Sequence, residues 1–109
     1  MTSPGASFSA KDNPAEGRFE MWVDGHMAFV RYRPVGDALA ITYTEVPEEL
    51  KGRGVGSRLM RDVLDQLRAR GSKVISACSF ASSYIDRHPE YSDMLVTDRD
   101  DPIDDRGEG

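Results

Sequence analysis

The feature that most constrains this chain is a turn with glycine at every second position, Lys51-Gly52-Arg53-Gly54-Val55-Gly56. A β-branched and aromatic run precedes the turn and ends at Pro47, and apolar residues with helical spacing follow it as far as Arg70. The segment is therefore predicted to be a strand, a glycine-rich turn and the start of a helix. Because glycine has no side chain, the backbone N–H groups of such a turn can approach an anion closely, at the positive end of the helix dipole. The pattern predicts a cradle for a pyrophosphate.

A turn between a strand and a helix often holds a glycine or two, which would explain these glycines without any ligand. Two well-known phosphate loops are excluded by their spacing. No Gly-Lys-Ser/Thr follows four residues after a first glycine, as a P-loop requires, and the third glycine comes one position too early for the dinucleotide fingerprint. The local charge still favours an anionic ligand, because residues 51–73 hold seven Lys or Arg against two acids.

The rest of the chain predicts an α+β fold with the element order βββαβα and no internal repeat. Asp24-Gly25 lies between two alternating runs and can supply the positive φ angles of a two-residue hairpin turn. Gly71 is a natural end for the helix after the glycine-rich turn, and His88-Pro89 ends the last helix. The expected strands are 18–23, 26–32, 38–46 and 73–78, and the expected helices are 54–70 and 80–87.

The length of 109 residues suits one domain, since two separate cores would each be too small to be stable. We expect this domain at residues 18–96. Residues 1–17 and 97–109 are poor in large apolar side chains, so we expect a flexible N-terminal segment and a flexible acidic tail. No apolar run reaches the roughly 18 residues of a membrane span, and the N-terminus resembles neither a signal peptide nor a transit peptide. We therefore expect a cytoplasmic protein with no membrane contact.

The composition also excludes several kinds of site. A net charge of −5 argues against general affinity for nucleic acid. Cys78 is the only cysteine, so no internal disulfide can form, and no Cys/His cluster has the spacing of a zinc site. We expect no metal. The hairpin and the third strand offer an exposed edge that could pair in a weak dimer, but Arg31 and Arg33 would resist such pairing, so a monomer is the default expectation.

Three motifs follow one another in an order that resembles the small single-domain GNAT-like N-acetyltransferases. Thr44-Glu45-Val46-Pro47 comes first, the glycine-rich loop second, and Cys78 with His88-Pro89-Glu90-Tyr91 last. The loop itself resembles the family pattern Gln/Arg-x-x-Gly-x-Gly/Ala, with Lys51 in the first place. The resemblance covers residues 18–95. It implies a truncated fold whose mainly antiparallel sheet is splayed open before the loop, where acetyl-CoA binds, without the N-terminal helices that shape the acceptor pocket in larger relatives.

The resemblance also implies which residues contact the cofactor, acetyl-CoA or CoA. Backbone amides of residues 51–57 would hold the pyrophosphate, Arg53 or Arg58 would add charge, and the strand edge near Val46 would bond the pantetheine arm as an added strand does. The expected cofactor-binding residues are Val46, Lys51, Gly52, Arg53, Gly54, Val55, Gly56, Ser57 and Arg58.

Cys78 and His88 are the expected catalytic residues. The resemblance implies that Cys78 takes the acetyl group as a thioester while His88 accepts the proton. Each also has a structural explanation, because a lone cysteine in an apolar strand is commonly a small buried hydrophobe and a histidine at a helix end can cap the last carbonyls. Glu45 could act as a base and Tyr84 as a proton donor, although exposure at a strand end and packing explain these two residues equally well.

Two functions are compatible with these residues. The first is an N-acetyltransferase that acts on an unidentified amine, through an acetyl-thioester at Cys78. The second is a module that binds CoA or acetyl-CoA without efficient turnover, because the helices that would shape an acceptor pocket are missing. Release of CoA that depends on an added acceptor distinguishes the two.

Overall fold

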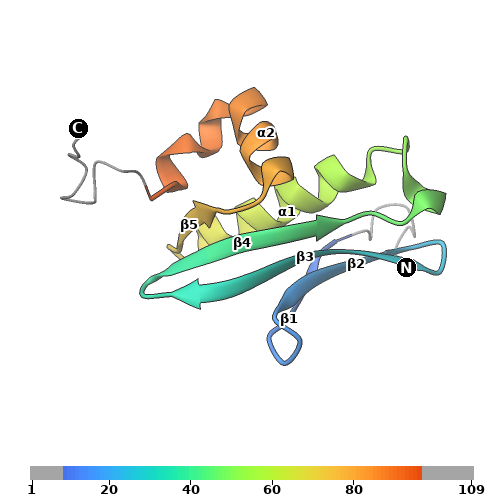
Figure 1. The fold of residues 1–109 in the computed structure, drawn as a ribbon, viewed down its shortest axis with the longest axis horizontal. Helices are drawn as coiled ribbons and strands as arrows, with labels where there is room; N and C mark the ends of the chain where they lie inside the picture. Colours follow the sequence, from blue (N-terminus) through green and yellow to red (C-terminus); the bar gives the residue numbers. More distant parts are fainter. Residues whose placement is uncertain (1–8, 97–109) are drawn as a thin grey trace.

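The computed structural model describes residues 9–96, in which five strands form one sheet and both α-helices lie on the same face of it (Figure 1). The strands lie side by side in chain order: β1 (Lys11–Asn13), β2 (Arg18–Val23), β3 (His26–Val35), β4 (Ala38–Glu45) and β5 (Lys73–Ser76). Neighbouring strands are antiparallel except β4 and β5, which are parallel. The helices are α1 (Val55–Ala69) and α2 (Ser79–Arg87), with short 3-10 helices η2 (Glu48–Leu50) and η3 (Pro89–Met94). This arrangement confirms the α+β fold with a mainly antiparallel sheet.

The β2–β3 hairpin and the amphipathic helix form as the sequence predicts. Asp24 and Gly25 join β2 to β3 with φ angles of 51° and 82°, the left-handed conformation that a tight hairpin turn needs. α1 ends before Gly71, whose φ is 74°. The buried residues of α1 are those of the predicted apolar stripe: Val55, Leu59, Met60, Val63, Leu64 and Leu67.

Alternation along β2 and β3 decides which face of the sheet the helices cover. Phe19, Met21 and Val23 of β2 are buried, as are Ala28 and Val30 of β3, and they share one core with α1 and α2. Successive residues of a strand point to opposite faces. The intervening side chains therefore project from the other face, which neither helix covers (Figure 1). We call it the open face.

β1 is a strand that the sequence did not predict, and it lies upstream of residue 18, where we expected the folded region to begin. It pairs with the first half of β2. Lys-Asp-Asn has little intrinsic preference for a strand, so contacts with distant residues hold the segment in place. The carboxylate of Asp12 accepts hydrogen bonds from Tyr32 and Arg70, and the backbone of Ala10 is hydrogen-bonded to side chains of α1.

Residues 1–8 and the predicted acidic tail at 97–109 lie outside the described residues. Within residues 9–96, no helix has the length and apolar character needed to cross a membrane.

A β-bulge in β4 reverses the direction in which its side chains point. Arg31 pairs with Tyr43 while the next residue, Tyr32, pairs with Ile41, so Thr42 is an extra residue on β4. Before the bulge, Ile41 is buried beneath the helices; after it, Tyr43 is exposed. Thr42 Oγ1 donates a hydrogen bond to the carbonyl oxygen of Arg31 at 3.3 Å, which holds the bulge.

The sheet opens beyond this bulge. β5 pairs with β4 only from Ala38 to Ile41, and the last bond between them runs from the amide of Ala77 to the carbonyl of Ile41 at 2.9 Å. The chain then turns away into α2. The end of β4, residues 42–45, therefore has no strand beside it on the β5 side, and this confirms the predicted splay of the sheet.

Candidate functional site

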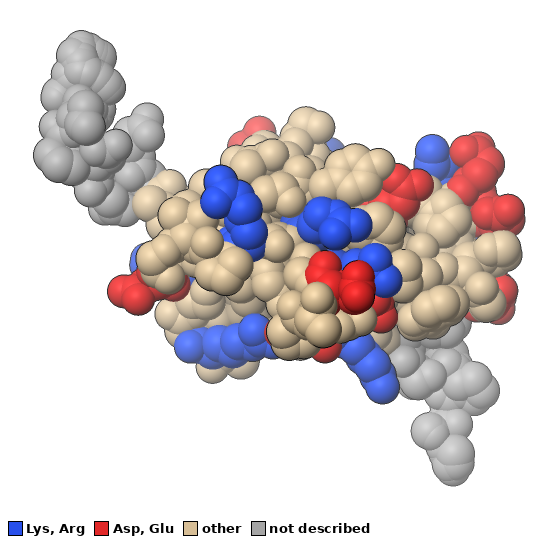
Figure 2. Space-filling view, turned by 60° about the horizontal axis from the view of Figure 1, so that its bottom comes forward, with Lys and Arg blue, Asp and Glu red and all other residues tan. Residues whose placement is uncertain are grey.

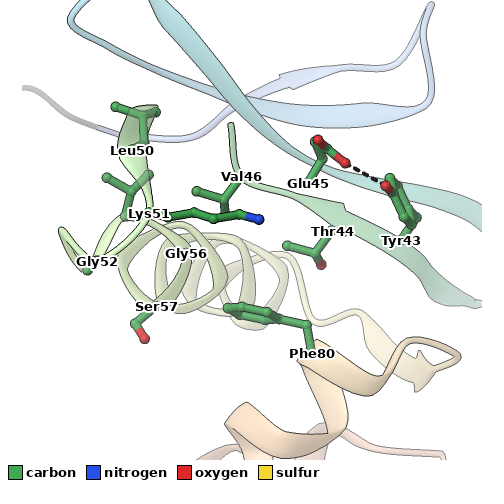
Figure 3. Close-up of a pocket in the computed structure, with 12 residues that line it drawn as sticks. Tyr43, Thr44, Glu45, Val46, Leu50, Lys51, Gly52, Gly56, Ser57 and Phe80 are labelled. Carbon is green, nitrogen blue, oxygen red and sulfur yellow. Dashed lines mark hydrogen bonds between the residues drawn. The ribbon is translucent and has the colours of Figure 1, made fainter. Parts of the chain in front are cut away.

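A cavity of about 550 Å³ lies between the end of β4, the N-terminus of α1 and the first turn of α2 (Figure 3). The bulge and the splay create it, because β4 continues where β5 has turned away. The residues that line the cavity are Tyr43, Thr44, Glu45, Val46, Leu50, Lys51, Gly52, Gly54, Val55, Gly56, Ser57 and Phe80. Of the nine predicted cofactor-binding residues, all except Arg53 and Arg58 are in this lining.

The three alternate glycines serve two different needs. Gly52 and Gly54 have φ angles of 79° and 76°, which residues with a side chain rarely adopt, and a Cβ on either would meet nothing within 4 Å. Gly56 lies inside α1 with an ordinary helical φ. A Cβ there would lie 2.8 Å from Cζ of Phe80 and 3.2 Å from Cγ2 of Val46. The first two glycines are required by backbone conformation and the third by close packing.

The N-terminus of α1 presents free hydrogen-bond donors to this cavity. Gly54 is the N-cap of the helix, and no side chain caps it. The N–H groups of Val55, Gly56 and Ser57 have no acceptor within the helix, as is general for a first turn. All three residues line the cavity. Their amides and the positive end of the helix dipole form a site for an anion.

The basic residues near the loop differ in how much of their charge is free. Arg53 donates to Asp24 at 2.8 Å, and Lys51 lies 3.5 Å from Glu48. Arg58 and Arg61 have no carboxylate partner in the part of the chain from 9 to 96. These two arginines line a second, smaller cavity of about 240 Å³, which meets the first one at Gly54 and Ser57 and is otherwise lined by Tyr84 and His88. Arg53 and Arg58 were predicted as alternatives for binding the pyrophosphate, and Arg58 is therefore the one whose charge no carboxylate of residues 9–96 neutralises.

The end of β4 gives the first cavity two chemically different walls. Because of the bulge, Thr44 points toward the helices, while Tyr43 and Glu45 point toward the open face (Figure 3). Tyr43 Oη donates a hydrogen bond to Oε1 of Glu45 at 2.5 Å. This bond to a carboxylate raises the pKa of Tyr43, so the phenol stays protonated and keeps the Glu45 side chain in place.

Cys78 lies beside the cavity, next to Thr44. The Sγ atom of Cys78 and the Oγ1 atom of Thr44 are 3.5 Å apart, and the cysteine is partly buried. Cys78 follows β5 by two residues and is the N-cap of α2, and no side chain caps that helix end. The first-turn amides of α2 are therefore available to an anion that forms near the thiol.

His88 is not near Cys78. It is the C-cap of α2, so the nine-residue helix separates the two residues by about 15 Å at the rise of an α-helix. The His88 ring instead stacks on Tyr84, with ring centroids 4.1 Å apart, and lines the second cavity with Arg58 and Arg61. The expected contact between the two catalytic candidates is not made. Tyr84, the possible proton donor, also lies at the second cavity rather than the first.

Five residues that line the two cavities were not predicted as site residues: Tyr43, Thr44, Leu50, Arg61 and Phe80. Thr44 and Tyr43 belong to a predicted strand, but their facing depends on the bulge, for which Thr42 gives no clear signal. Phe80 was assigned only to the last helix. No group of three or more His, Cys, Asp or Glu side chains suited to a metal ion occurs among residues 9–96.

Comparison with known proteins agrees with this geometry. The model of the GCN5-related N-acetyltransferase family matches residues 18–94. The chain belongs to this family. The fold is also similar to the solution structure of a GCN5-like protein from Staphylococcus aureus, a proposed N-acetyltransferase, with 30% sequence identity and a TM-score of 0.64. The similarity covers 84% of this chain and 90% of that one.

Members of the GCN5-related family generally use acetyl-CoA, and the residues of this chain fit such a cofactor. A long, narrow ligand with a phosphate-rich end requires a channel that leads to an anion site. Here the first cavity runs from the end of β4 to the free amides of α1, and the second continues toward Arg58 and Arg61.

Proposed function

We propose that this protein is an N-acetyltransferase that transfers the acetyl group of acetyl-CoA to an amine. The observation that carries the proposal is the cavity between the splayed end of β4 and the uncapped N-terminus of α1. It combines a strand edge with free backbone groups, three free amide donors for a pyrophosphate and the carboxylate of Glu45; the thiol of Cys78 lies just outside the lining, beside Thr44. The family assignment supports the same activity.

In this proposal the loop and the two cavities bind successive parts of the cofactor. The edge of β4 at residues 44–46 hydrogen-bonds the pantetheine arm, and the amides of residues 55–57 hold the pyrophosphate. Arg58, Arg61 and His88 hold the phosphorylated nucleotide end in the second cavity. His88 therefore has a binding role here instead of the catalytic role that the sequence implied.

The bound cofactor supplies an acetyl group activated as a thioester. Sγ of Cys78 forms a bond to the acetyl carbonyl carbon, the bond from that carbon to the CoA sulfur breaks, and CoA leaves as the thiol with the proton from Cys78. First-turn amides of α2 stabilise the oxyanion. A protonated amine then gives one proton to Glu45, and its neutral form attacks the acetyl carbon and displaces the Cys78 sulfur. The second proton, which the nitrogen loses as the amide forms, passes to that sulfur, so Cys78 returns to the thiol.

The first test is a calorimetric titration with acetyl-CoA, followed by intact mass measurement. Binding together with a single acetyl adduct that maps to Cys78 and is absent in Cys78→Ala supports the relay. If Cys78→Ala binds acetyl-CoA and acetylates an amine at the normal rate, the cysteine step is wrong and transfer is direct, with Glu45→Gln then the inactive variant. No binding would refute the cofactor assignment itself.

A second candidate, a CoA-binding module without turnover, is favoured by the open face, where no helix shapes a pocket for the acceptor. It predicts tight binding of acetyl-CoA and no release of CoA with any added amine. Steady CoA release with spermidine, lysine methyl ester or a lysine-containing peptide would exclude it.

A further inference from the structure

We infer that the acceptor is a lysine side chain of another polypeptide, in an acidic stretch of that chain, which docks on the open face of the sheet. The inference rests on the proposed acetyltransferase function and identifies its missing substrate. It begins from the wall of the first cavity that faces away from the helices. Tyr43 and Glu45 form that wall, so the cavity opens onto the open face beside a hydrogen-bonded carboxylate (Figure 3).

The open face next to this opening carries three large aromatic side chains, those of Trp22, Phe29 and Tyr43. In the register of the sheet, Tyr43 lies opposite Arg31, and Glu45 lies opposite Phe29. The Phe29 and Tyr43 rings are in contact, with centroids 6.1 Å apart. Trp22 projects from the same face of β2 and is 57% exposed, and Tyr43 is 49% exposed. Large aromatic side chains at this exposure, with arginines among them, are typical of protein interfaces.

The shape of the open face favours a polypeptide over a small free amine as the acceptor. A pocket that selects a small molecule encloses most of the ligand surface. Both α-helices lie on the opposite face, so the structure from residue 9 to residue 96 provides no wall around an acceptor here. Viewed obliquely from the side away from the helices, the surface is broad and mainly uncharged, with basic and acidic groups scattered across it (Figure 2). Such a surface can hold an acceptor only through a wide contact.

The charges on the open face indicate the chemistry of the partner. Glu45 at the opening attracts a protonated amine and then takes its proton. Arg31 and Arg33 are exposed and have no carboxylate partner within the described chain, and the Arg31 guanidinium lies over the Phe29 ring at 5.3 Å. Arg31 is diagonal to Glu45 across β3 and β4, about 7 Å away. Two residues of an extended peptide span about the same distance, so an acidic residue two positions from the lysine would meet Arg31.

The test compares matched acceptors with the intact protein. One is a short peptide with a single lysine and a glutamate at the second position on each side; the control peptide has glutamine at those positions, and lysine methyl ester represents a small amine. Acetylation is followed by peptide mass and by kcat/KM. We expect the glutamate peptide to exceed the glutamine peptide by about fivefold, as one exposed ion pair allows, and to exceed lysine methyl ester by more.

Variants of the open face separate this inference from the proposed function. Arg31→Gln should abolish the preference for glutamate, Arg31→Lys should retain most of it, and Trp22→Ser should lower kcat/KM for peptides about tenfold but not for lysine methyl ester. Affinity for acetyl-CoA, measured by calorimetry, should not change in any of them. Equal rates with the peptides and the small amine, or unchanged rates in Arg31→Gln and Trp22→Ser, would overturn the inference while leaving the acetyltransferase proposal intact. Acetylation confined to lysines of the protein itself would also overturn it, whereas failure to bind acetyl-CoA would refute the proposed function.

Discussion

Replacement of Gly56 by alanine tests how the cavity is built. The added Cβ would lie 2.8 Å from Cζ of Phe80, whereas carbon atoms in favourable contact are about 3.5–4.0 Å apart. Since the backbone of α1 is fixed by its hydrogen bonds, the ring of Phe80 must move by about 0.7 Å or more. Phe80 lines the cavity, so its movement changes the space that the ligand occupies.

The effects of Gly56→Ala on stability and on binding should differ. Overpacking costs about 1–3 kcal/mol, but alanine is favoured over glycine inside a helix by about 1 kcal/mol. The free energy of unfolding in urea should therefore fall by only about 0–2 kcal/mol. The Kd for acetyl-CoA should rise about tenfold, because the displaced ring alters the cavity wall.

Two further variants make this prediction specific. Gly36→Ala adds a Cβ that meets nothing within 4 Å, in the turn between β3 and β4, which is not part of either cavity; it should leave the Kd unchanged. Phe80→Leu in the Gly56→Ala background removes the ring atoms nearest the new methyl group and should restore part of the affinity. An unchanged Kd in Gly56→Ala, with the protein folded, would refute the argument that close packing explains this glycine.

Three other changes have expected outcomes. Gly54→Ala forces a side chain into a left-handed conformation with no steric neighbour, and should lower the free energy of unfolding in urea by about 1–2 kcal/mol. Burial and the hydrogen bond to Asp12 raise the pKa of Tyr32 to about 12, so folding favours the protonated phenol. The stabilisation from this phenol is complete below a pH of about 10, the pKa of tyrosine in the unfolded chain. In thermal melts, wild type should therefore lose more stability than Tyr32→Phe as pH rises from about 10 to about 12. In calorimetry, Arg61→Gln should weaken the binding of acetyl-CoA about fivefold but should not weaken the binding of acetyl-dephospho-CoA, which lacks the phosphate that Arg61 is proposed to hold. Arg33→Gln, a control on the open face, should leave the affinity for both ligands unchanged.

Local patterns in the sequence were sufficient for much of the fold. The buried stripe of α1, the Asp24-Gly25 hairpin and the helix end at Gly71 each depend on residues close in the chain, and the structure confirms all three. The cavity lining also contains most of the residues predicted around the glycine-rich loop, because these residues are close together in the chain. Whether they bind acetyl-CoA remains a prediction.

Contacts between distant residues could not be predicted in this way. β1 depends on Tyr32 and Arg70, and the need for glycine at position 56 depends on Phe80, 24 positions later. The distance between Cys78 and His88 is a different case. A helix between them was already predicted, and helical rise alone separates two residues at opposite ends of such a helix by about 15 Å. The proposed proton transfer between them was inconsistent with that prediction.

The bulge at Thr42 determines which chemistry each side of the site receives. If β4 instead paired regularly through Thr42, it would keep the alternation of Ile41, so that Tyr43 and Glu45 would face the core and Thr44 would face outward. Deletion of Thr42 would remove the bulge without this exchange, because Tyr43 would then follow Ile41 directly and keep its place opposite Arg31. In relatives of this protein, a gap at position 42 should therefore leave the two sides of the site as they are, whereas a gap one or two positions later would exchange them, and alignments of the family should be examined for where such gaps fall before residue types are compared.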